Sequence, residues 1–341
     1  MSGLVVHRIG PIATVQDMGR PGFLKQGLSR GGAVDRLALL EGAALLRQDP
    51  SLAALEMAGT GGEFEATGPV RIALSGAPMA ATIDGQGVAW NANHRLLKGQ
   101  RLTIGAAKSG VYGYLHLGGG IDAPEFLGAR SAHLLAGIGR MAQAGDVLKG
   151  GRDKGDITGL GLKVTDRFNG GRVRVVPSVQ TGLFAAETLQ RFENTGFARG
   201  PRANRMGVEM LSDGGGFTAD GQLNILSEVI VPGDIQMTGD GLPFVLLPEC
   251  QTTGGYPRIA TVIPCDLPLV AQAPDGAPVK FEFITLDQAL VAQAQYETAI
   301  SALPGLCKPL IRDVADMHDL LSYQLISGAI SAHWDKERQD D

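Results

Sequence analysis

Directly after an apolar run, the chain reads Gln251-Thr252-Thr253-Gly254-Gly255-Tyr256-Pro257. The preceding run, residues 244–247, is typical of a buried strand that ends at Pro248. Gly254 and Gly255 allow the backbone to approach a ligand closely, so that consecutive N–H groups can point at one oxygen. Gln251 presents one acceptor and two donors in a plane, which complements another amide. The same stretch also suits a tight turn between strands, because Gly and Pro punctuate most turns.

This stretch resembles a motif of the carboxyltransferase-domain family, and two N-terminal segments extend the resemblance. They are a Gln-Asp-x-Gly-Arg segment at residues 16–20 and a Gly-x-x-Asp segment that ends at Asp35. The resemblance covers roughly residues 4–285. The family includes the C-type subunits of 5-oxoprolinase, the KipA proteins, the protein called allophanate hydrolase subunit 2, and part of urea carboxylase. It implies cyclophilin-like β-barrels and a site shared with a KipI-like partner.

Composition excludes several classes of protein. The 341 residues suffice for two domains, and 44% hydrophobic with 19% charged residues indicate a globular chain. A net charge of −5 argues against nucleic-acid and membrane partners. The three cysteines (Cys250, Cys265 and Cys307) lack metal-ligand spacing and form an odd set, which favours reduced thiols in a cytoplasm. No metal site is expected.

Many short strands joined by turns are expected, because 49 Gly and 18 Pro are spread through the chain without a period. Together with the resemblance, this predicts a mainly β protein with a few helices, built of two cyclophilin-like β-barrel domains and a C-terminal helical extension. The expected divisions are an N-terminal barrel (1–150), a linker (151–171), a C-terminal barrel with the Gln251 stretch (172–285), and the extension (286–341). His116, in a predicted strand, is interpreted as a hydrogen-bonded packing residue.

Helices are predicted at residues 33–47 and 184–192. A capping box at Thr285 and Gln288 opens another that ends near Pro304. A further helix is expected from Pro309, with an apolar face through Leu325 and a frayed tail at residues 335–341. Both C-terminal helices are interpreted as packing braces.

The chain departs from the family pattern at three places. Family members commonly carry Asn on and just after the first helix, where this chain has Glu41 and Gln48. The family favours an acidic residue where Asn204 stands, directly before Arg205. An Asp there would orient the Arg and balance its charge, whereas Asn can only orient it.

Two residue types recur in Gly- or Pro-bounded contexts, namely Gln and Arg. Amides recognise amides, and Arg binds carboxylates or phosphates bidentately. A substrate with both features is a lactam acid, a ureido group or a urea derivative, and the substrates attributed to the family belong to this set. The candidate catalytic residues are Gln251, Thr252, Thr253, Gly254, Gly255, Tyr256 and Asp17. The candidate substrate-binding residues are Arg20, Arg205, Gln16, Gln236, Gln272 and Asp35.

The roles follow from the chemistry of each group. The N–H groups of Gly254 and Gly255 would stabilise an oxyanion, and Gln251 would align the N–C=O group. Arg20 or Arg205 would hold an anionic end, while Asp17 or Tyr256 would move a proton.

The resemblance implies one component of an ATP-dependent 5-oxoprolinase, which opens 5-oxoproline to glutamate. The other components would be a KipI-like, B-type subunit and an A-type subunit. ATP would act in the assembled complex, bound by this chain or by a partner. One alternative is the carboxyltransferase component of a biotin-dependent urea or amide carboxylase, although the chain has no biotin-carrier Met-Lys-Met segment. Another alternative is a non-enzymatic KipA-like regulator that binds a KipI-like protein.

Overall fold

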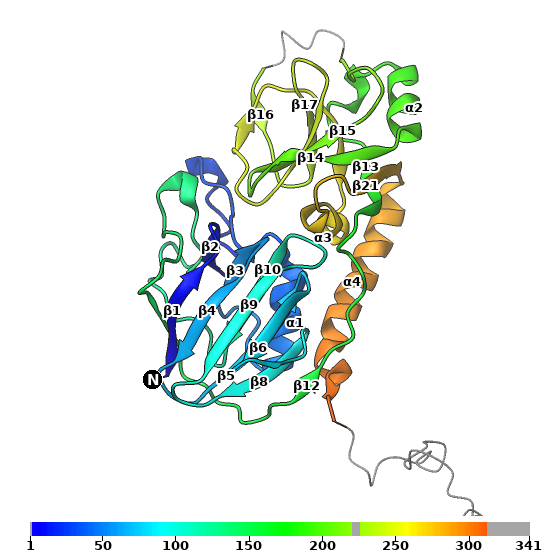
Figure 1. The fold of residues 1–341 in the computed structure, drawn as a ribbon. Helices are drawn as coiled ribbons and strands as arrows, with labels where there is room; N and C mark the ends of the chain where they lie inside the picture. The colour runs from blue at the N-terminus through cyan, green and yellow to red at the C-terminus, as the bar shows by residue number, and fades with distance from the viewer. Residues whose placement is uncertain (1, 220–225, 312–341) are drawn as a thin grey trace, which may run out of the picture.

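The computed structural model describes residues 2–219 and 226–311. It has two β units, with α4 running alongside both (Figure 1). The predicted mainly β class and the few helices are confirmed. The described part of the chain contains no helix that is long and apolar enough to cross a membrane. The second predicted C-terminal helix and the tail at residues 335–341 lie outside the described residues, except that Pro309, the expected first residue of that helix, belongs to a strand, β22 (Lys308–Pro309).

The first unit consists of two sheets. The first sheet runs β11 (Val147–Lys149), β1 (Gly3–Ile9), β4 (Gly62–Ala66), β9 (Arg101–Ala107), β6 (Met79–Ile83) and β7 (Gln86–Gly87). The second runs β2 (Ala13–Gln16), β3 (Ala54–Ala58), β10 (Tyr112–Leu117), β5 (Val70–Gly76), β8 (Ala92–Leu96), β12 (Leu160–Gly161) and β22 (Lys308–Pro309). One core cluster joins the sheets, with Leu4 and Phe64 from the first and Leu74 and Leu115 from the second.

The strands of this unit therefore form a pair of sheets rather than the closed ring expected for residues 1–150. Every residue of β5 and β10 is buried, so both faces of the second sheet are covered. Helix α1 (Arg36–Leu46) covers the outer face, as the stripe at residues 33–47 predicts. His116 is buried beneath it and hydrogen-bonded to Ser75 Oγ at 2.8 Å, in agreement with a packing role.

The second unit is the expected closed barrel. Its strand order is β13 (Gly171–Val176), β20 (Arg258–Val262), β17 (Asp234–Met237), β18 (Pro243–Leu246), β15 (Gly207–Leu211), β14 (Phe197–Ala203) and β21 (Pro278–Phe283). Alternation places Val173 and Val175 inside, while Arg172 and Arg174 point outward. Helix α2 (Ala186–Asn194) places Phe192 in the core, where its ring stacks on Phe281 with 5.2 Å between centroids. A small separate sheet pairs β16 (Glu228–Val229) with β19 (Thr253–Gly254).

Two helices connect the units (Figure 1). Helix α3 (Leu267–Gln272) lies between the barrel strands β20 and β21 along the chain and reaches the first unit through Gln272. Helix α4 (Leu286–Leu306) begins with the predicted capping box at Thr285 and packs on α1. After α4 the chain enters β22, which pairs with β12 of the predicted linker. Residues 151–171 thus contribute a strand to the first unit, and Asp153 in this segment pairs with Arg71 at 2.5 Å.

Candidate functional site

The stretch of residues 251–257 forms a corner on the surface of the barrel unit, between β18 and β20. Gln251 and Thr253 are exposed, and Tyr256 is 53% exposed. Thr253 and Gly254 pair with β16, so this part of the corner has strand geometry. The corner is therefore presented to solvent and is not packed into the barrel core.

A cavity of about 610 Å³ opens beside this corner. This volume lies within the roughly 300–1,000 Å³ of typical small-molecule sites. Its polar lining comprises Arg202, Asn204, Gln236, Thr238, Gln251 and Tyr256. Three residues predicted from the sequence, Gln236, Gln251 and Tyr256, are thus brought to one cavity from separate parts of the barrel. We call it the corner cavity.

Gln236 of β17 is the residue of this cavity with an unmet bonding requirement. It is only 8% exposed, and its Nε2 is buried without a hydrogen-bond partner in the described part of the chain. A buried donor left unsatisfied costs about 1–3 kcal/mol. Because the atom itself is buried, a ligand oxygen in the cavity would remove that cost only after the amide turns toward the cavity.

Gly254 approaches the Gln236 amide closely. A Cβ atom at position 254 would lie 2.6 Å from Gln236 Nε2 and 3.1 Å from Ile230 Cδ1. Any side chain at this position would therefore displace the Gln236 amide. The close approach of Gly254 to a ligand stays a prediction, and the neighbour for which this glycine makes room in the structure is the Gln236 side chain.

The corner cavity is almost free of unpaired charge. Its cation, Arg202, is engaged by Glu209, to which Nε donates at 2.8 Å, and its guanidinium lies 5.2 Å from the centroid of the Phe244 ring. The remaining polar groups are amides, hydroxyls and a phenol. This set suits a neutral, planar N–C=O group, which needs one acceptor for its N–H and donors for its carbonyl.

Gln16 and Asp17 lie in the first unit, away from the corner cavity. Gln16 Nε2 donates to Thr14 Oγ1 at 2.9 Å, and its Oε1 is buried without a partner among the described residues. Asp17 accepts from the backbone N–H groups of Gly19 at 2.8 Å and Arg130 at 2.5 Å. Both carboxylate oxygens of Asp17 therefore hold loops in place, and its proton-transfer role stays a prediction.

Arg20 lies near these residues, is 1% exposed and borders a different cavity between the two units. Its Nη2 donates to the Ser131 carbonyl, whereas Nη1 has no partner in the described residues. Burial lowers the pKa of Arg20, although Asp17 and Glu249 oppose that shift. Its assignment to an anionic substrate group stays a prediction.

Arg205 joins the two units through hydrogen bonds from each of its guanidinium nitrogens. It donates to Glu249 at 2.7 Å, to the Glu56 carboxylate and to the Gly32 carbonyl at 2.6 Å. The Asn204 side chain does not take part, because its Oδ1 accepts from the Met206 N–H at 2.7 Å. Glu249 and Glu56 thus supply the orientation and charge balance expected of an acidic residue at position 204. This geometry gives Arg205 a structural role, and substrate binding by it stays untested.

Asp35 and Gln272 belong to the same polar seam between the units. Asp35 caps α1, and its Oδ2 accepts from Gln272 Nε2 and from Arg167 Nε, both at 2.8 Å. Arg167 also binds both oxygens of Glu41, at 2.9 and 2.7 Å. Every one of these groups is satisfied by the protein itself, and none lines the corner cavity.

Sequence reasoning missed the partners of these buried charges. Glu56 and Arg167 stand next to no motif, Glu249 lies just before the Gln251 stretch, and the partners of all three lie far away along the chain. Two of the departures from the family pattern, Glu41 and Gln48, are explained by contacts in the structure. Glu41 pairs with Arg167, and Gln48 holds a turn by accepting from the Gly119 N–H at 2.9 Å.

Comparison with known proteins identifies relatives that share most of the chain. The sequence profile of "Carboxyltransferase domain, subdomain A and B" matches residues 26–283. The 5-oxoprolinase C subunit of Escherichia coli is 37% identical over 85% of this chain and 94% of its own length. The Haemophilus influenzae protein of the same name is 32% identical over 81% of this chain and 90% of its own.

A solved structure supports the fold. The Kluyveromyces lactis urea amidolyase superposes with a TM-score of 0.80 at 22% identity, over 91% of this chain. This chain spans 21% of that longer protein, and at such identity the likeness concerns the fold alone. The profile match and the two close relatives together show that the chain belongs to the carboxyltransferase-domain family.

Proposed function

We propose that the chain is the C-type subunit of an ATP-dependent 5-oxoprolinase, which opens the lactam of 5-oxoproline to glutamate together with A- and B-type subunits in the cytoplasm. The unpartnered amide of Gln236, facing a cavity lined by Gln251 and Tyr256, is the observation that carries the proposal. The resemblance to two proteins named as C subunits of 5-oxoprolinase, over almost their whole length, supports it.

The corner cavity suits the lactam ring in a defined way. Gln236 Nε2 would donate to the lactam carbonyl, and the Gln251 amide would pair with the ring N–C=O edge. Water would attack the lactam carbonyl carbon, and as the C–N bond breaks the Tyr256 phenol would donate a proton to the ring nitrogen and regain one from the attacking water. These groups orient the reacting bond, and the charge that develops on the carbonyl oxygen strengthens the Gln236 hydrogen bond.

ATP does not fit the corner cavity. A triphosphate requires several cationic or N–H donors, and the cation there, Arg202, is already paired with Glu209. We therefore assign ATP to another surface of the assembly, and no step at the corner uses it. Placing ATP on another surface agrees with the proposal that the corner cavity is active only when the partner subunits are present.

Reconstitution tests the proposal. The purified chain is combined with A- and B-type subunits, ATP and 5-oxoproline, and glutamate is measured against mixtures that each lack one component. Glutamate formation that requires this chain and ATP is the expected result. Association with the B-type subunit without any turnover would instead favour the KipA-like regulator, and no association at all would refute the assignment to this complex.

Carboxyl transfer is the second candidate, because the same cavity suits the ureido group of biotin or urea itself. The fold shared with urea amidolyase is compatible with this candidate. The deciding assay is transfer of labelled carboxyl from carboxybiotin to urea by the purified chain. Transfer without 5-oxoproline turnover would favour this candidate over the first.

A further inference from the structure

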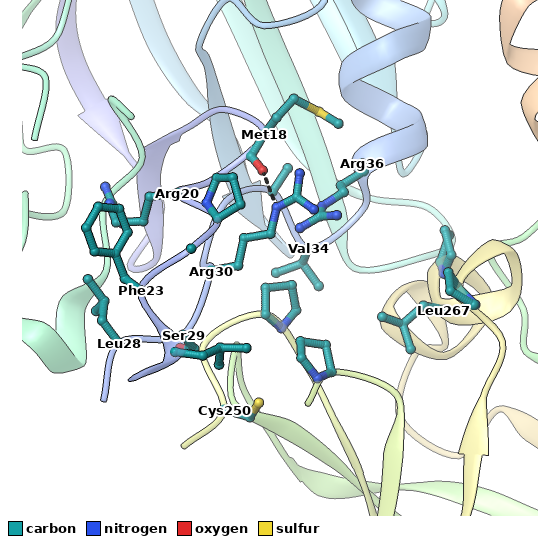
Figure 2. A pocket seen from close by; sticks show the side chains of 18 of the residues that line it. Met18, Arg20, Phe23, Leu28, Ser29, Arg30, Val34, Arg36, Cys250 and Leu267 are labelled. Atoms are coloured by element: carbon teal, nitrogen blue, oxygen red, sulfur yellow. Dashed lines mark hydrogen bonds between the residues drawn. The ribbon is translucent and has the colours of Figure 1, made fainter. Parts of the chain in front are cut away.

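A second cavity, about 470 Å³ in volume, lies between the two units (Figure 2). Its walls come from the loop that follows β2, from the start of α1, from the barrel and from α4. Apolar side chains, among them Val34, Pro248 and Leu267, form much of the surface. It shares only Ile230 and Cys250 with the corner cavity, so the two have different linings. We call it the interdomain cavity.

Arg30 and Arg36 bring two like charges into this cavity. Figure 2 shows their guanidinium groups side by side, with Arg20 lying apart from them. Burial, and then the charge of Arg30, lowers the pKa of Arg36 to about 10. Arg30 Nε donates to the Met18 carbonyl at 3.0 Å. Neither guanidinium is paired with a carboxylate among residues 2–219 and 226–311.

The position of Arg36 makes its unpaired positive charge still less favourable. It is the first residue of α1, where the helix dipole carries partial positive charge. A cation there is unfavourable by about 0.3–1 kcal/mol, and the adjacent Arg30 increases the repulsion. Elsewhere in the seam between the units, Arg167 and Arg205 each have two carboxylates. The Arg30–Arg36 pair therefore differs from the structural arginines around it.

We propose that Arg30 and Arg36 form a binding site for the oxyanion group, carboxylate or phosphate, of a small molecule. The planar guanidinium fork binds both groups bidentately, and two forks together neutralise one such anion. Tyr296 of α4 lines the same cavity, and its hydroxyl makes no hydrogen bond within the described chain, so it supplies a further donor. The apolar walls accommodate the carbon skeleton. This inference does not rest on the proposed lactam chemistry.

Calorimetric titration of the full chain tests this site. Sodium phosphate and sodium acetate are titrated separately, with sodium chloride holding the ionic strength constant. Saturable one-to-one binding of at least one anion is expected, with affinity falling at least about tenfold in Arg36→Gln and in Arg30→Gln. Arg101→Gln is the control, since Arg101 is exposed and pairs with Glu65 at 3.5 Å. Stronger binding of phosphate identifies a phosphoryl ligand, and stronger binding of acetate a carboxylate.

Thermal melting gives a second readout that separates binding from folding. Arg36→Gln removes a like-charge contact, so without anion it is expected to melt no lower than the wild-type chain. The rise in Tm that the anion causes in the wild-type chain should disappear in the variant. The proposal is overturned if neither anion binds saturably at up to about 10 mM. It is equally overturned if both variants keep wild-type affinity and the full rise in Tm.

Discussion

Gln272 Nε2 donates a 2.8 Å hydrogen bond to Asp35 Oδ2, which joins α3 of the barrel unit to the N-cap of α1. The Oε1 atom of the same amide accepts from the backbone N–H groups of Val111 and Tyr112, both at 2.9 Å. The side chain thus meets all of its bonding needs within the protein. Gln236, another buried glutamine of the barrel unit, leaves its Nε2 unpaired among the described residues. We therefore expect replacement of these two glutamines to have different effects.

Replacing Gln272 by Leu should destabilise the fold. The change leaves the buried N–H of Tyr112, the half-buried N–H of Val111 and one lone pair of Asp35 without a partner, and each buried unsatisfied group costs about 1–3 kcal/mol. We expect the free energy of unfolding, measured by urea denaturation, to fall by about 2–4 kcal/mol. A loss below about 1 kcal/mol would show that water replaces these bonds at little cost.

Replacing Arg205 by Met should be more damaging, because it leaves Glu56 and Glu249 buried and unpaired. Breaking a buried ion pair on one side costs about 3–5 kcal/mol. Arg172→Met is the matched control, since Arg172 pairs with Glu282 at an exposed position and should cost less than about 1 kcal/mol. Equal losses in the two variants, measured by urea denaturation, would contradict the structural role of Arg205.

Replacing Gly254 by Ala should reduce turnover more than stability. The new Cβ would meet Gln236 Nε2 at 2.6 Å, and that flexible side-chain end can move, at the expense of its position in the cavity. We expect kcat/KM of the reconstituted enzyme to fall at least about tenfold, which corresponds to about 1.4 kcal/mol. Gly196→Ala is the control, because nothing lies within 4 Å of its added Cβ. Equal kinetics in both variants would remove Gly254 from the site.

His116 should make stability depend on pH. Burial lowers the pKa of His116 to about 3, from an ordinary value of 6.5. Below pH 6.5 the unfolded chain binds a proton at this position that the folded chain does not, so stability falls as pH falls. The loss is about 1.4 kcal/mol per pH unit, or about 2 kcal/mol between about pH 6.5 and about pH 5. Burial also lowers the pKa values of His94 and His133, so urea denaturation at both pH values should show a loss that is smaller in His116→Gln than in the wild-type chain by about 2 kcal/mol.

The elements with local signals could be predicted from the sequence. The capping box at Thr285 and the helix ahead of Asp49 follow from neighbouring residues, whereas the closed barrel was expected from the family resemblance. The solvent-facing corner at residues 251–257 was also predicted, because its glycines and polar residues follow a strand. The paired sheets of the first unit were not predicted, since alternation indicates strands and does not show how a sheet closes.

The site was predicted less completely than the fold. Gln236, Gln251 and Tyr256 converge on one cavity, yet Gln272 and Asp35, chosen on the same grounds, turn into the seam between the units. Composition and spacing identify a side chain that can hydrogen-bond, whereas its direction depends on partners far along the chain. The Arg30–Arg36 pair was missed for the same reason, because nothing in the sequence shows that these two guanidinium groups meet in one cavity.

Glutamate formation by the reconstituted enzyme carrying Gln236→Leu tests the central claim most directly. Leu removes the unpaired donor and leaves no described protein group unsatisfied, so the free energy of unfolding should change by less than about 1 kcal/mol. We predict a fall in kcat/KM of about a hundredfold, with assembly intact and with exposed Gln143→Leu unaffected. Wild-type turnover by an intact Gln236→Leu complex would contradict that claim.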